Sequence, residues 1–448
     1  MNVVRRKEIL ALLLGDFAVF FVALYLTLTV RFGTLPSQEV LLIHLIPFFV
    51  LFLVSLLISF IAGLYEKHTL VFKGKLPATL TRVQVINAVV GIAFFYFIPY
   101  LNITPKIVLF IYLVISLVLM VAWRMALAET LGLRRRTKAL LFSRKNPDTE
   151  RLYHEINNNQ RYGTFFMEWI DPSSSTLPST EIMEHVRSKK VTLIVADFTD
   201  PKVNDLMPTL YGLIFSGVQF GDIQKLYEEV FDQVPLSLVN DTWFIENVSS
   251  STKSSFDIFK RLIDITTSVI GGVISLIFYP FICSAIKLDD GGVIFSYQDR
   301  VGQNNKIIRI VKFRTMTVAN DGGQWTTGEN KVTRVGSFLR KSRLDELPQF
   351  FNVFRGDLSL VGPRPEFPSA VESYNSSVPY YNIRHIIKPG LFGWAQIQHQ
   401  KHPHHGLDVE ETKNKLSYDL YYVKNRSVFL EMKIIVQTIK ILLSFVGR

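Results

Sequence analysis

Four long apolar segments stand out at the start of the chain, at residues 9–30, 40–64, 83–101 and 106–127. A helix needs roughly 20 mostly apolar residues to cross the hydrocarbon core of a bilayer. Each segment supplies about that length, so the pattern predicts four transmembrane helices within residues 1–130. Asp16 lies inside the first segment, where a hydrogen bond between helices is a simpler interpretation than a part in chemistry.

The loops between these segments predict their orientation. Basic clusters at residues 5–7, 67–82 and 134–136 fall on one side, whereas the other side carries only Arg31 and Lys106. Short cytoplasmic loops hold the excess of lysine and arginine in membrane proteins. We therefore expect the N terminus, and everything after the fourth helix, in the cytoplasm.

Residues 135–245 show a different pattern, in which short apolar runs alternate with polar stretches. Residues 138–142 (KALLF) and 191–197 (VTLIVAD) are typical of buried strands, with helices between them. A dinucleotide-binding domain would place glycines after its first strand, but that turn is SRKN at residues 143–146. The pattern predicts a degenerate Rossmann-like α/β domain with a scaffold or regulatory role, followed by a polar, serine-rich linker at residues 240–253.

A fifth apolar segment covers residues 256–286 and allows two topologies. Lys260 and Arg261 precede its apolar centre and Lys287 follows it, so the charges favour neither side. Pro280 lacks an amide hydrogen and breaks or kinks a helix. Composition alone leaves two alternatives open, a helix that bends at Pro280 and returns to the same face, and a kinked fifth span.

Composition narrows the classes of function. The 448 residues carry a formal net charge of +11, and 48% of them are hydrophobic. A basic, apolar chain indicates anionic lipids or phosphorylated substrates as partners, while such long apolar segments argue against nucleic acid. Cys283 is the only cysteine, which excludes an internal disulfide and a cysteine-based zinc site and fits a reducing cytosol.

Candidate chemistry lies near the C-terminal end of the chain. Asp345 and Glu346 are adjacent carboxylates, which repel each other unless cations or a metal ion offset them. Basic residues that could do so are Lys312, Arg314, Arg340 and Arg364. Mg²⁺ binds one or two carboxylates together with substrate phosphates, and a carboxylate can attack phosphorus. These residue types indicate phosphoryl transfer, although an Asp-Glu pair by itself more often just opens a helix.

Seven stretches follow one another over residues 260–396, namely KRLID (260–264), VKFRTM (311–316), RVGSFLR (334–340), LDELPQ (344–349), NV (352–353), GDLSLVGPRP (356–365) and KPGLFGWAQ (388–396). This series resembles the monotopic polyprenyl-phosphate phosphoglycosyl transferases, also called the bacterial sugar transferase family. The apolar block and the α/β domain resemble the long-form members of that family. Two positions depart from it, Tyr279 where many members have serine and Phe392 where threonine is common.

The resemblance implies roles for particular residues. Asp345 corresponds to the catalytic nucleophile, and Glu346 to the partner carboxylate that binds Mg²⁺. The substrate-binding basic residues correspond to Lys312, Arg340 and Arg364, with Arg314 in the same run as Lys312. A re-entrant membrane helix at residues 256–286 would break at Pro280, and residues 256–448 would form the α/β catalytic domain.

The implied reaction transfers a sugar 1-phosphate from a UDP-sugar to undecaprenyl phosphate and releases UMP, through an aspartyl-phosphosugar intermediate or by direct transfer. It would initiate exopolysaccharide, capsule or O-antigen synthesis at the cytoplasmic face of a bacterial inner membrane, among the lipids of that membrane. No motif identifies the sugar. The extra helices and the α/β domain favour a homodimer. The rival classes are a transporter and a catalytically inactive membrane scaffold of a polysaccharide assembly complex, neither of which would release UMP.

Three further features are given simpler interpretations. The histidines of residues 399–405 do not have the spacing of a zinc motif, so we expect a loop without a metal. Tyr418, Tyr421 and Tyr422 are expected to pack the domain rather than stack on uracil. Residues 427–446 have the pattern of an amphipathic helix, which would lie on the bilayer or pack on the re-entrant helix.

Overall fold

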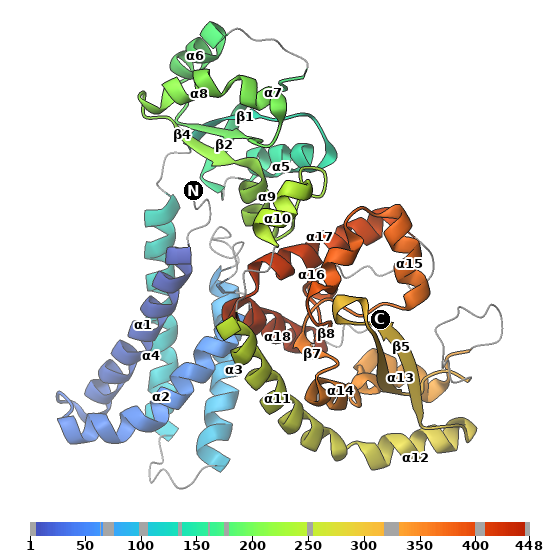
Figure 1. The fold of residues 1–448 in the computed structure, drawn as a ribbon. Helices are drawn as coiled ribbons and strands as arrows, with labels where there is room; N and C mark the ends of the chain where they lie inside the picture. Colours follow the sequence, from blue (N-terminus) through green and yellow to red (C-terminus); the bar gives the residue numbers. More distant parts are fainter. Residues whose placement is uncertain are drawn as a thin grey trace. The chain divides into compact units, whose positions relative to one another are not determined.

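The computed structural model describes residues 6–62, 64–65, 76–97, 106–132, 137–159, 162–173, 179–248, 254–317, 331–398 and 408–443. It divides into two compact units, Met1–Val230 and Phe231–Arg448 (Figure 1).

The first unit begins with four helices, α1 (Arg6–Phe32), α2 (Gln38–Ile61), α3 (Leu76–Phe97) and α4 (Lys106–Gly132). Three segments are long and apolar enough to cross a membrane, Ala11–Phe32, Gln38–Ile61 and Ile107–Leu127. The predicted third span runs beyond the end of α3, and its described apolar part, Leu80–Phe95, is shorter. The apolar helices are therefore confirmed, whereas four complete spans stay a prediction.

A charged cluster lies in the interior of this helical block. Asp16 of α1 and Arg124 of α4 form an ion pair, and both side chains are fully buried. The Arg124 Nε lies 3.1 Å from the Asp16 carboxylate, and the Tyr65 hydroxyl donates to the same carboxylate at 2.6 Å. The expected hydrogen bonding of Asp16 between helices is confirmed, and its partners are a cation and a phenol.

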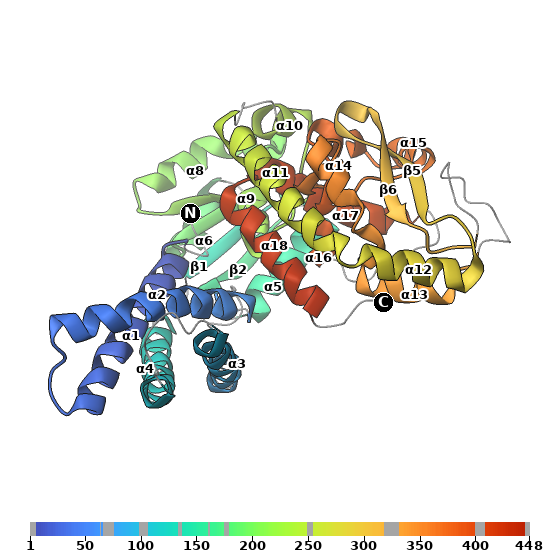
Figure 2. The same cartoon turned by 90° about the horizontal axis from the view of Figure 1, so that it is seen from below.

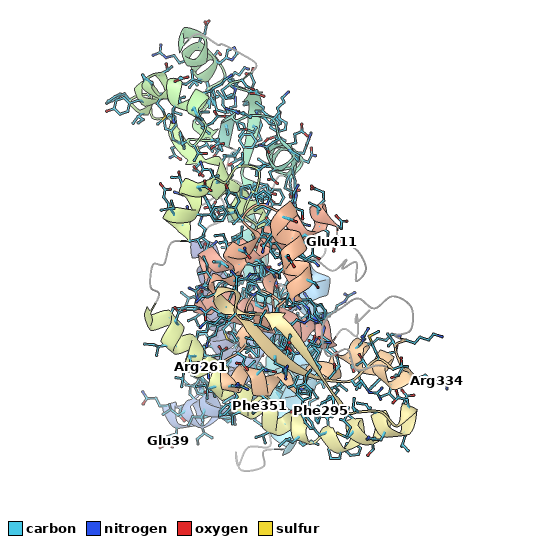
Figure 3. The ribbon with its side chains drawn as sticks, turned by 45° about the vertical axis from the view of Figure 1, so that its right-hand side comes forward. Glu39, Arg261, Phe295, Arg334, Phe351 and Glu411 are labelled. Carbon is cyan, nitrogen blue, oxygen red and sulfur yellow. The ribbon has the colours of Figure 1, made fainter. Side chains whose placement is uncertain are left out.

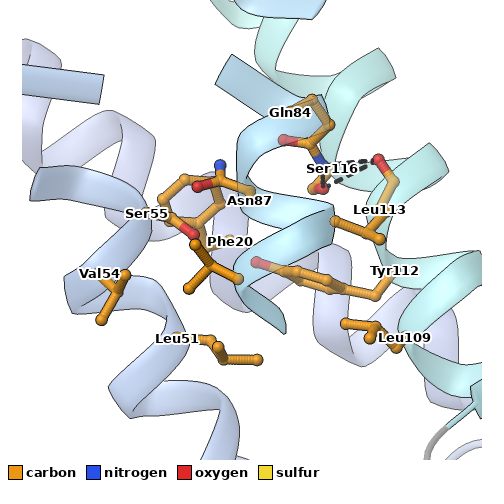
Figure 4. A pocket seen from close by; sticks show the side chains of 11 residues that line it. Phe20, Leu51, Val54, Ser55, Gln84, Asn87, Leu109, Tyr112, Leu113 and Ser116 are labelled. Atoms are coloured by element: carbon orange, nitrogen blue, oxygen red, sulfur yellow. Dashed lines mark hydrogen bonds between the residues drawn. The ribbon is translucent and has the colours of Figure 1, made fainter. Parts of the chain in front are cut away.

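The same block contains a small cavity with a partly polar lining (Figure 4). Gln84 of α3 donates to the Ser116 hydroxyl of α4 at 2.6 Å and to the Leu113 carbonyl at 2.8 Å. The Asn87 side-chain oxygen and the Tyr112 hydroxyl also line it, buried and without a hydrogen-bond partner in the part of the chain that the structure describes. Polar groups of α3 and α4 thus form a second polar site in the interior of this block, apart from the Asp16–Arg124 pair.

The rest of the first unit is an α/β domain. Its elements are β1 (Thr137–Phe142), α5 (Pro147–Asn158), β2 (Thr164–Ile170), α6 (Ser179–Ser188), β3 (Leu193–Ala196), α7 (Pro201–Asp205), α8 (Met207–Ile214), β4 (Gln219–Asp222) and α9 (Ile223–Phe231). The strands form one parallel sheet in the order β2-β1-β3-β4. Both predicted strands are present as β1 and β3, which are apolar because helices cover a parallel sheet on both faces.

The glycine-free turn after β1 is built by side-chain capping. Asn146 accepts a hydrogen bond from the Thr149 amide, Thr149 accepts one from the Asn146 amide, and Pro147 occupies the first turn of α5. Such a reciprocal cap satisfies helix N–H groups with the chain's own side chains. It replaces the glycine-rich turn through which a dinucleotide-binding domain presents those groups to a pyrophosphate.

The second unit carries the remaining elements. Its helices are α10 (Asp241–Asn247), α11 (Ser254–Leu276), α12 (Tyr279–Asp290), α13 (Arg334–Ser342), α14 (Gln349–Arg355), α15 (Pro368–Ser377), α16 (Trp394–Gln398), α17 (Val409–Asn425) and α18 (Val428–Leu443). Short 3₁₀ helices are η3 (Gln303–Asn305), η4 (Leu344–Glu346) and η5 (Tyr381–Ile386). β5 (Phe295–Val301) and β6 (Ile307–Phe313) form an antiparallel hairpin, and β7 (Ser359–Val361) pairs in parallel with β8 (Gly390–Phe392).

Part of the predicted linker at residues 240–253 is helical. Asn240 caps α10 by accepting a hydrogen bond from the Trp243 amide. Trp243 and Phe244 are buried in a cluster with residues of α15 and α17. The linker prediction is wrong for residues 241–247, because these two aromatic side chains bury enough apolar surface to hold a helix against the second unit.

The fifth apolar segment forms two helices. α11 and α12 meet at a bend of 55° across residues 277 and 278, and Pro280 lies in the first turn of α12. Proline is tolerated there because that amide would have no partner inside the helix. α14 runs beside α11 (Figure 2). The packing is close at Gly271, where a Cβ atom would lie 2.8 Å from the Phe350 ring.

Candidate active site

The two adjacent carboxylates lie in η4, directly after α13. Thr333 caps the start of α13 by accepting a hydrogen bond from the Gly336 amide. Arg343 ends the helix in a left-handed conformation, with φ of 57°. This turn leads the chain into η4, where Glu346 is 9% exposed and Asp345 is half-buried.

Glu346 is held by cations from three different segments. Its Oε1 lies 3.2 Å from the Lys312 Nζ of β6 and 3.2 Å from an Arg364 Nη2 in the loop after β7. Its Oε2 lies 4.0 Å from the Arg343 guanidinium. Burial opposes ionisation of Glu346, but the charges of Lys312 and Arg364 outweigh burial and lower the pKa of this carboxyl group. Glu346 is therefore ionised at neutral pH.

Asp345 has a different environment. No hydrogen bond or ion pair joins its carboxylate to another residue within the described ranges. Burial and the neighbouring charge of Glu346 raise its pKa to about 6. The site thus contains one carboxylate engaged with cations and one carboxylate whose oxygens remain open. A carboxylate of the second kind is suited to act as a nucleophile.

Two further contacts hold Arg364 and Lys312 in place. The Arg364 carbonyl accepts a hydrogen bond of 3.0 Å from Arg384, whose guanidinium also pairs with the buried Asp419 at 2.7 Å. Lys312 lies in β6 opposite Ser296 of β5. Burial lowers the pKa of Lys312, although the charge of Glu346 opposes this. Both cations are therefore fixed by elements remote in sequence from η4.

Arg340 lies on α13, one turn before Asp345, and is exposed. Its Nε donates to the Thr315 hydroxyl at 2.9 Å. The charge of Arg340 lowers the pKa of Asp345, against the larger effect of burial. An exposed guanidinium beside an open carboxylate is positioned to meet an anionic group that approaches from solvent.

Comparison with known proteins identifies the family to which the residues of this site belong. A family model described as bacterial sugar transferase matches residues 255–445. The uncharacterized sugar transferase EpsL of Bacillus subtilis (strain 168) is 37% identical over 184 residues, which are 41% of this chain and 86% of EpsL. The chain belongs to the bacterial sugar transferase family.

Other members of the family carry specific names. The UDP-N-acetylgalactosamine-undecaprenyl-phosphate N-acetylgalactosaminephosphotransferase of Aeromonas hydrophila is 41% identical over 194 residues, 42% of this chain and 44% of that protein. The UDP-glucose:undecaprenyl-phosphate glucose-1-phosphate transferase of Klebsiella pneumoniae is 40% identical over 188 residues, 41% of this chain and 39% of that protein. The matched region spans less than half the length of these two relatives.

Arg314 is not part of the group around the dyad. Its side chain is 4% exposed and pairs with Asp290 at the end of α12. It also donates from Nε to the Val293 carbonyl at 2.6 Å and from Nη1 to the Met316 carbonyl at 3.0 Å. Of the basic residues expected to bind substrate, the structure brings Lys312, Arg340 and Arg364 to the dyad and uses Arg314 to tie α12 to the end of β6.

One buried cation near the site was not singled out from the sequence. Arg300 of β5 lies 3.3 Å from the centre of the Phe367 ring and donates to the Pro365 carbonyl at 3.3 Å. Burial lowers its pKa to about 10. Arg300 supports the loop that carries Arg364. A single arginine inside a strand has no local pattern that would have indicated this position.

The open oxygens of the dyad can be tested for their fit to Mg²⁺. Glu346 Oε1 accepts from two cations, whereas among the described residues Oε2 has only Arg343 at 4.0 Å, which is longer than a hydrogen bond. Asp345 adds two open oxygens. Within the described ranges, no group of three or more His, Cys, Asp or Glu side chains could hold a metal ion. Two carboxylates, completed by substrate phosphates and water, match the ligands that Mg²⁺ prefers.

The C-terminal part of the chain contains three further features predicted from the sequence. The histidines of residues 399–405 lie outside the described residues. Tyr418, Tyr421 and Tyr422 belong to an apolar cluster with α16 and α18, which confirms that they pack the domain. α18 covers most of the predicted amphipathic helix and packs through Leu430 and Ile434 into the same cluster.

Proposed function

We propose that the chain transfers a sugar 1-phosphate from a UDP-sugar to undecaprenyl phosphate and releases UMP. The asymmetric dyad is the observation that carries this proposal, because Asp345 is open and Glu346 is clamped between cations. The names of the relatives from Aeromonas hydrophila and Klebsiella pneumoniae describe reactions of this class.

In the first step, an oxygen of the ionised Asp345 attacks the phosphorus that carries the sugar. A new bond forms between that oxygen and phosphorus, and the bond between the phosphorus and the bridging oxygen of the diphosphate breaks. UMP leaves with the bridging oxygen and its electron pair. The product is an aspartyl phosphosugar, a covalent intermediate that divides one displacement into two.

In the second step, a phosphate oxygen of undecaprenyl phosphate attacks the same phosphorus. The bond to Asp345 breaks and its carboxylate is regenerated, so the cycle needs no external acid, base or redox partner. The product is an undecaprenyl diphosphate sugar, the first lipid-linked intermediate for exopolysaccharide, capsule or O-antigen synthesis.

Lys312, Arg364 and Arg340 stabilise the negative charge of the phosphates in both steps. Phosphoryl transfer depends mainly on positioning and on neutralisation of charge, and Lys312 and Arg364 are fixed in place before substrate arrives. Mg²⁺ held by Glu346, with Asp345 beside it, would supply further neutralisation of the diphosphate. Removal of Mg²⁺ with a chelator is expected to abolish UMP release, and added Mg²⁺ to restore it.

The lipid acceptor requires a site at the membrane surface. We propose that α11 and α12 form one re-entrant helix, which enters the cytoplasmic leaflet of a bacterial inner membrane and returns at the break before Pro280. The bend of 55° and exposed apolar side chains such as Ile270, Val273 and Phe281 support this arrangement. We propose that the chain assembles as a homodimer.

The experiment that tests this function measures UMP release by the full chain in a membrane, with undecaprenyl phosphate, Mg²⁺ and a panel of UDP-sugars. Release with one donor, lost in Asp345→Asn, is expected. Release of UDP would contradict the mechanism, and no release with any donor would favour the inactive scaffold. Radioactive phosphosugar that stays on the protein in the absence of undecaprenyl phosphate would establish the covalent intermediate over direct transfer.

A further inference from the structure

The short strand β7 leads directly into the loop that carries Arg364, and α11 holds this strand by a buried carboxylate. Asp264 of α11 is 3% exposed. Its Oδ1 accepts hydrogen bonds from the Leu360 amide at 2.9 Å and from the Ser359 hydroxyl at 3.1 Å. One side chain of α11 therefore fixes both the backbone and the side chain of β7.

A second contact reaches the last residue of the strand. The Lys260 Nζ of α11 donates to the Val361 carbonyl at 2.9 Å and to Glu431 of α18 at 2.6 Å. The Tyr422 hydroxyl lies 3.1 Å from the same Val361 carbonyl and also bonds to Glu431. The side chains of Lys260 and Glu431 are 11% and 6% exposed. Two polar side chains, Lys260 and Tyr422, thus meet at the carbonyl after which the loop begins, and Glu431 holds both of them.

α11 also holds the helix that follows the dyad. Arg261 donates to the Val353 and Phe354 carbonyls at the end of α14, at 2.8 and 2.7 Å. Arg261 and Phe351 of α14 are both labelled in Figure 3. Neighbouring residues of one helix therefore fix two segments, the strand before Arg364 and the helix after Glu346. The ion pair between Arg364 and Glu346 joins those two segments.

We propose that Lys260 and Asp264 are positioning residues, which act through the end of β7 to hold the Arg364 guanidinium on Glu346. The hydrogen bonds of Asp264 are buried and those of Lys260 are partly buried, and the chain between Val361 and Arg364 is only Gly362 and Pro363. Proline restricts its own backbone, so a displacement of the Val361 carbonyl is transmitted to Arg364. The expected effect on rate rests on the proposed function, whereas the coupling of α11 to β7 does not.

The first test is independent of activity. Hydrogen exchange of the peptide that spans residues 359–366 is measured in the full chain and in Lys260→Met, with Lys260→Arg as the conservative variant. Asp257→Asn is the matched control. Asp257 lies on α11 one turn before Lys260 and pairs with Arg426 at 2.9 Å, away from β7. Faster exchange in Lys260→Met, but not in Asp257→Asn, is expected, with recovery in Lys260→Arg.

The second test is a double-mutant cycle on the rate of UMP release. Misplacement of a group by about 1 Å can lower a rate on the order of 10²-fold, so Lys260→Met is expected to lower kcat/KM by about that factor. If Lys260 acts through Arg364, Lys260→Met in an Arg364→Lys background lowers kcat/KM by less than about threefold, because the residue that Lys260 positions is already altered. Tyr422→Phe, which removes one hydroxyl, is the milder variant should Lys260→Met not fold.

The outcomes separate this inference from the proposed function. Unchanged exchange over residues 359–366, or losses that multiply in the double mutant, would overturn the positioning role. Faster exchange together with losses that do not multiply would establish it. If the unaltered chain releases no UMP while the exchange difference persists, the proposed function fails and the geometric coupling of α11 to β7 stands.

Discussion

Arg314 and Arg364 give a direct test of how the structure divides the basic residues between stability and catalysis. Both follow strands of the catalytic unit, and the sequence predicts that both bind substrate. Arg314 is buried against Asp290 and three backbone carbonyls, whereas Arg364 faces Glu346 and is 39% exposed. We therefore expect Arg314→Met to lower stability and Arg364→Met to lower activity.

The magnitude for Arg314→Met follows from what the substitution leaves behind. Removing one partner of a buried ion pair costs about 3–5 kcal/mol. The Asp290 side chain is 26% exposed and can be hydrated, which favours the lower end, about 3 kcal/mol. For a domain of 150–250 residues each kcal/mol lowers the melting temperature by roughly 2–4 °C. The expected decrease for the catalytic unit is therefore roughly 6–12 °C.

The assay compares thermal unfolding and donor kinetics on the same preparations. The folded fraction of Arg314→Met is expected to keep its KM for the UDP-sugar within about twofold, because the substitution removes no group from the dyad. Arg364→Met leaves Glu346 paired with Lys312, so it is expected to lower the unfolding temperature by less than Arg314→Met does and to lose on the order of 10²–10³-fold in kcat. A stable Arg314→Met with a KM raised tenfold or more would refute this division.

Three further predictions concern pH, packing and the membrane block. Protonated Asp345 cannot attack phosphorus. Because its pKa is raised to about 6, the kcat/KM for the donor is expected to fall as pH decreases through 6, and bound Mg²⁺ would move this decrease to lower pH. A decrease centred above pH 7 would be inconsistent with Asp345 as the titrating group. A Cβ atom at Gly336 would lie 2.1 Å from the Thr315 carbonyl oxygen. Gly336→Ala is therefore expected to lower the free energy of unfolding by about 1–3 kcal/mol. An unchanged unfolding temperature would disprove this. Asp16→Asn weakens the buried pair with Arg124 and is expected to lower the unfolding temperature of the helical block in detergent. UMP release per folded molecule is expected to stay unchanged. A decrease in UMP release per folded molecule would argue against a purely structural pair.

Hydrophobic pattern was sufficient to predict several elements. The strands at β1 and β3 are continuous apolar runs, and their burial in a parallel sheet requires that pattern. The break between α11 and α12 lies beside Pro280, where the missing amide hydrogen made it expected. These features depend on neighbours in sequence, and for that reason the sequence alone reveals them.

The partners of the individual charged residues could not be predicted in the same way. Lys312 and Arg314 are two residues apart and would share a face of a continued strand, but β6 ends at Phe313. Arg314 turns back to Asp290, which lies 24 residues earlier. Arg384 meets Asp419 in the same manner. Long-range pairing decides these roles, and no local pattern encodes it.

The geometry of η4 explains how two adjacent carboxylates come to differ. In a 3₁₀ helix successive side chains point about 120° apart, so Asp345 and Glu346 cannot face the same surroundings. Glu346 points between β6 and the loop after β7, where Lys312 and Arg364 meet it. For Asp345, burial and the negative charge of its neighbour outweigh the nearby cations and raise its pKa. Cations therefore keep Glu346 ionised, whereas Asp345 has no hydrogen-bond or ion-pair partner among the described residues. A nucleophile next to a site for a cation requires that difference.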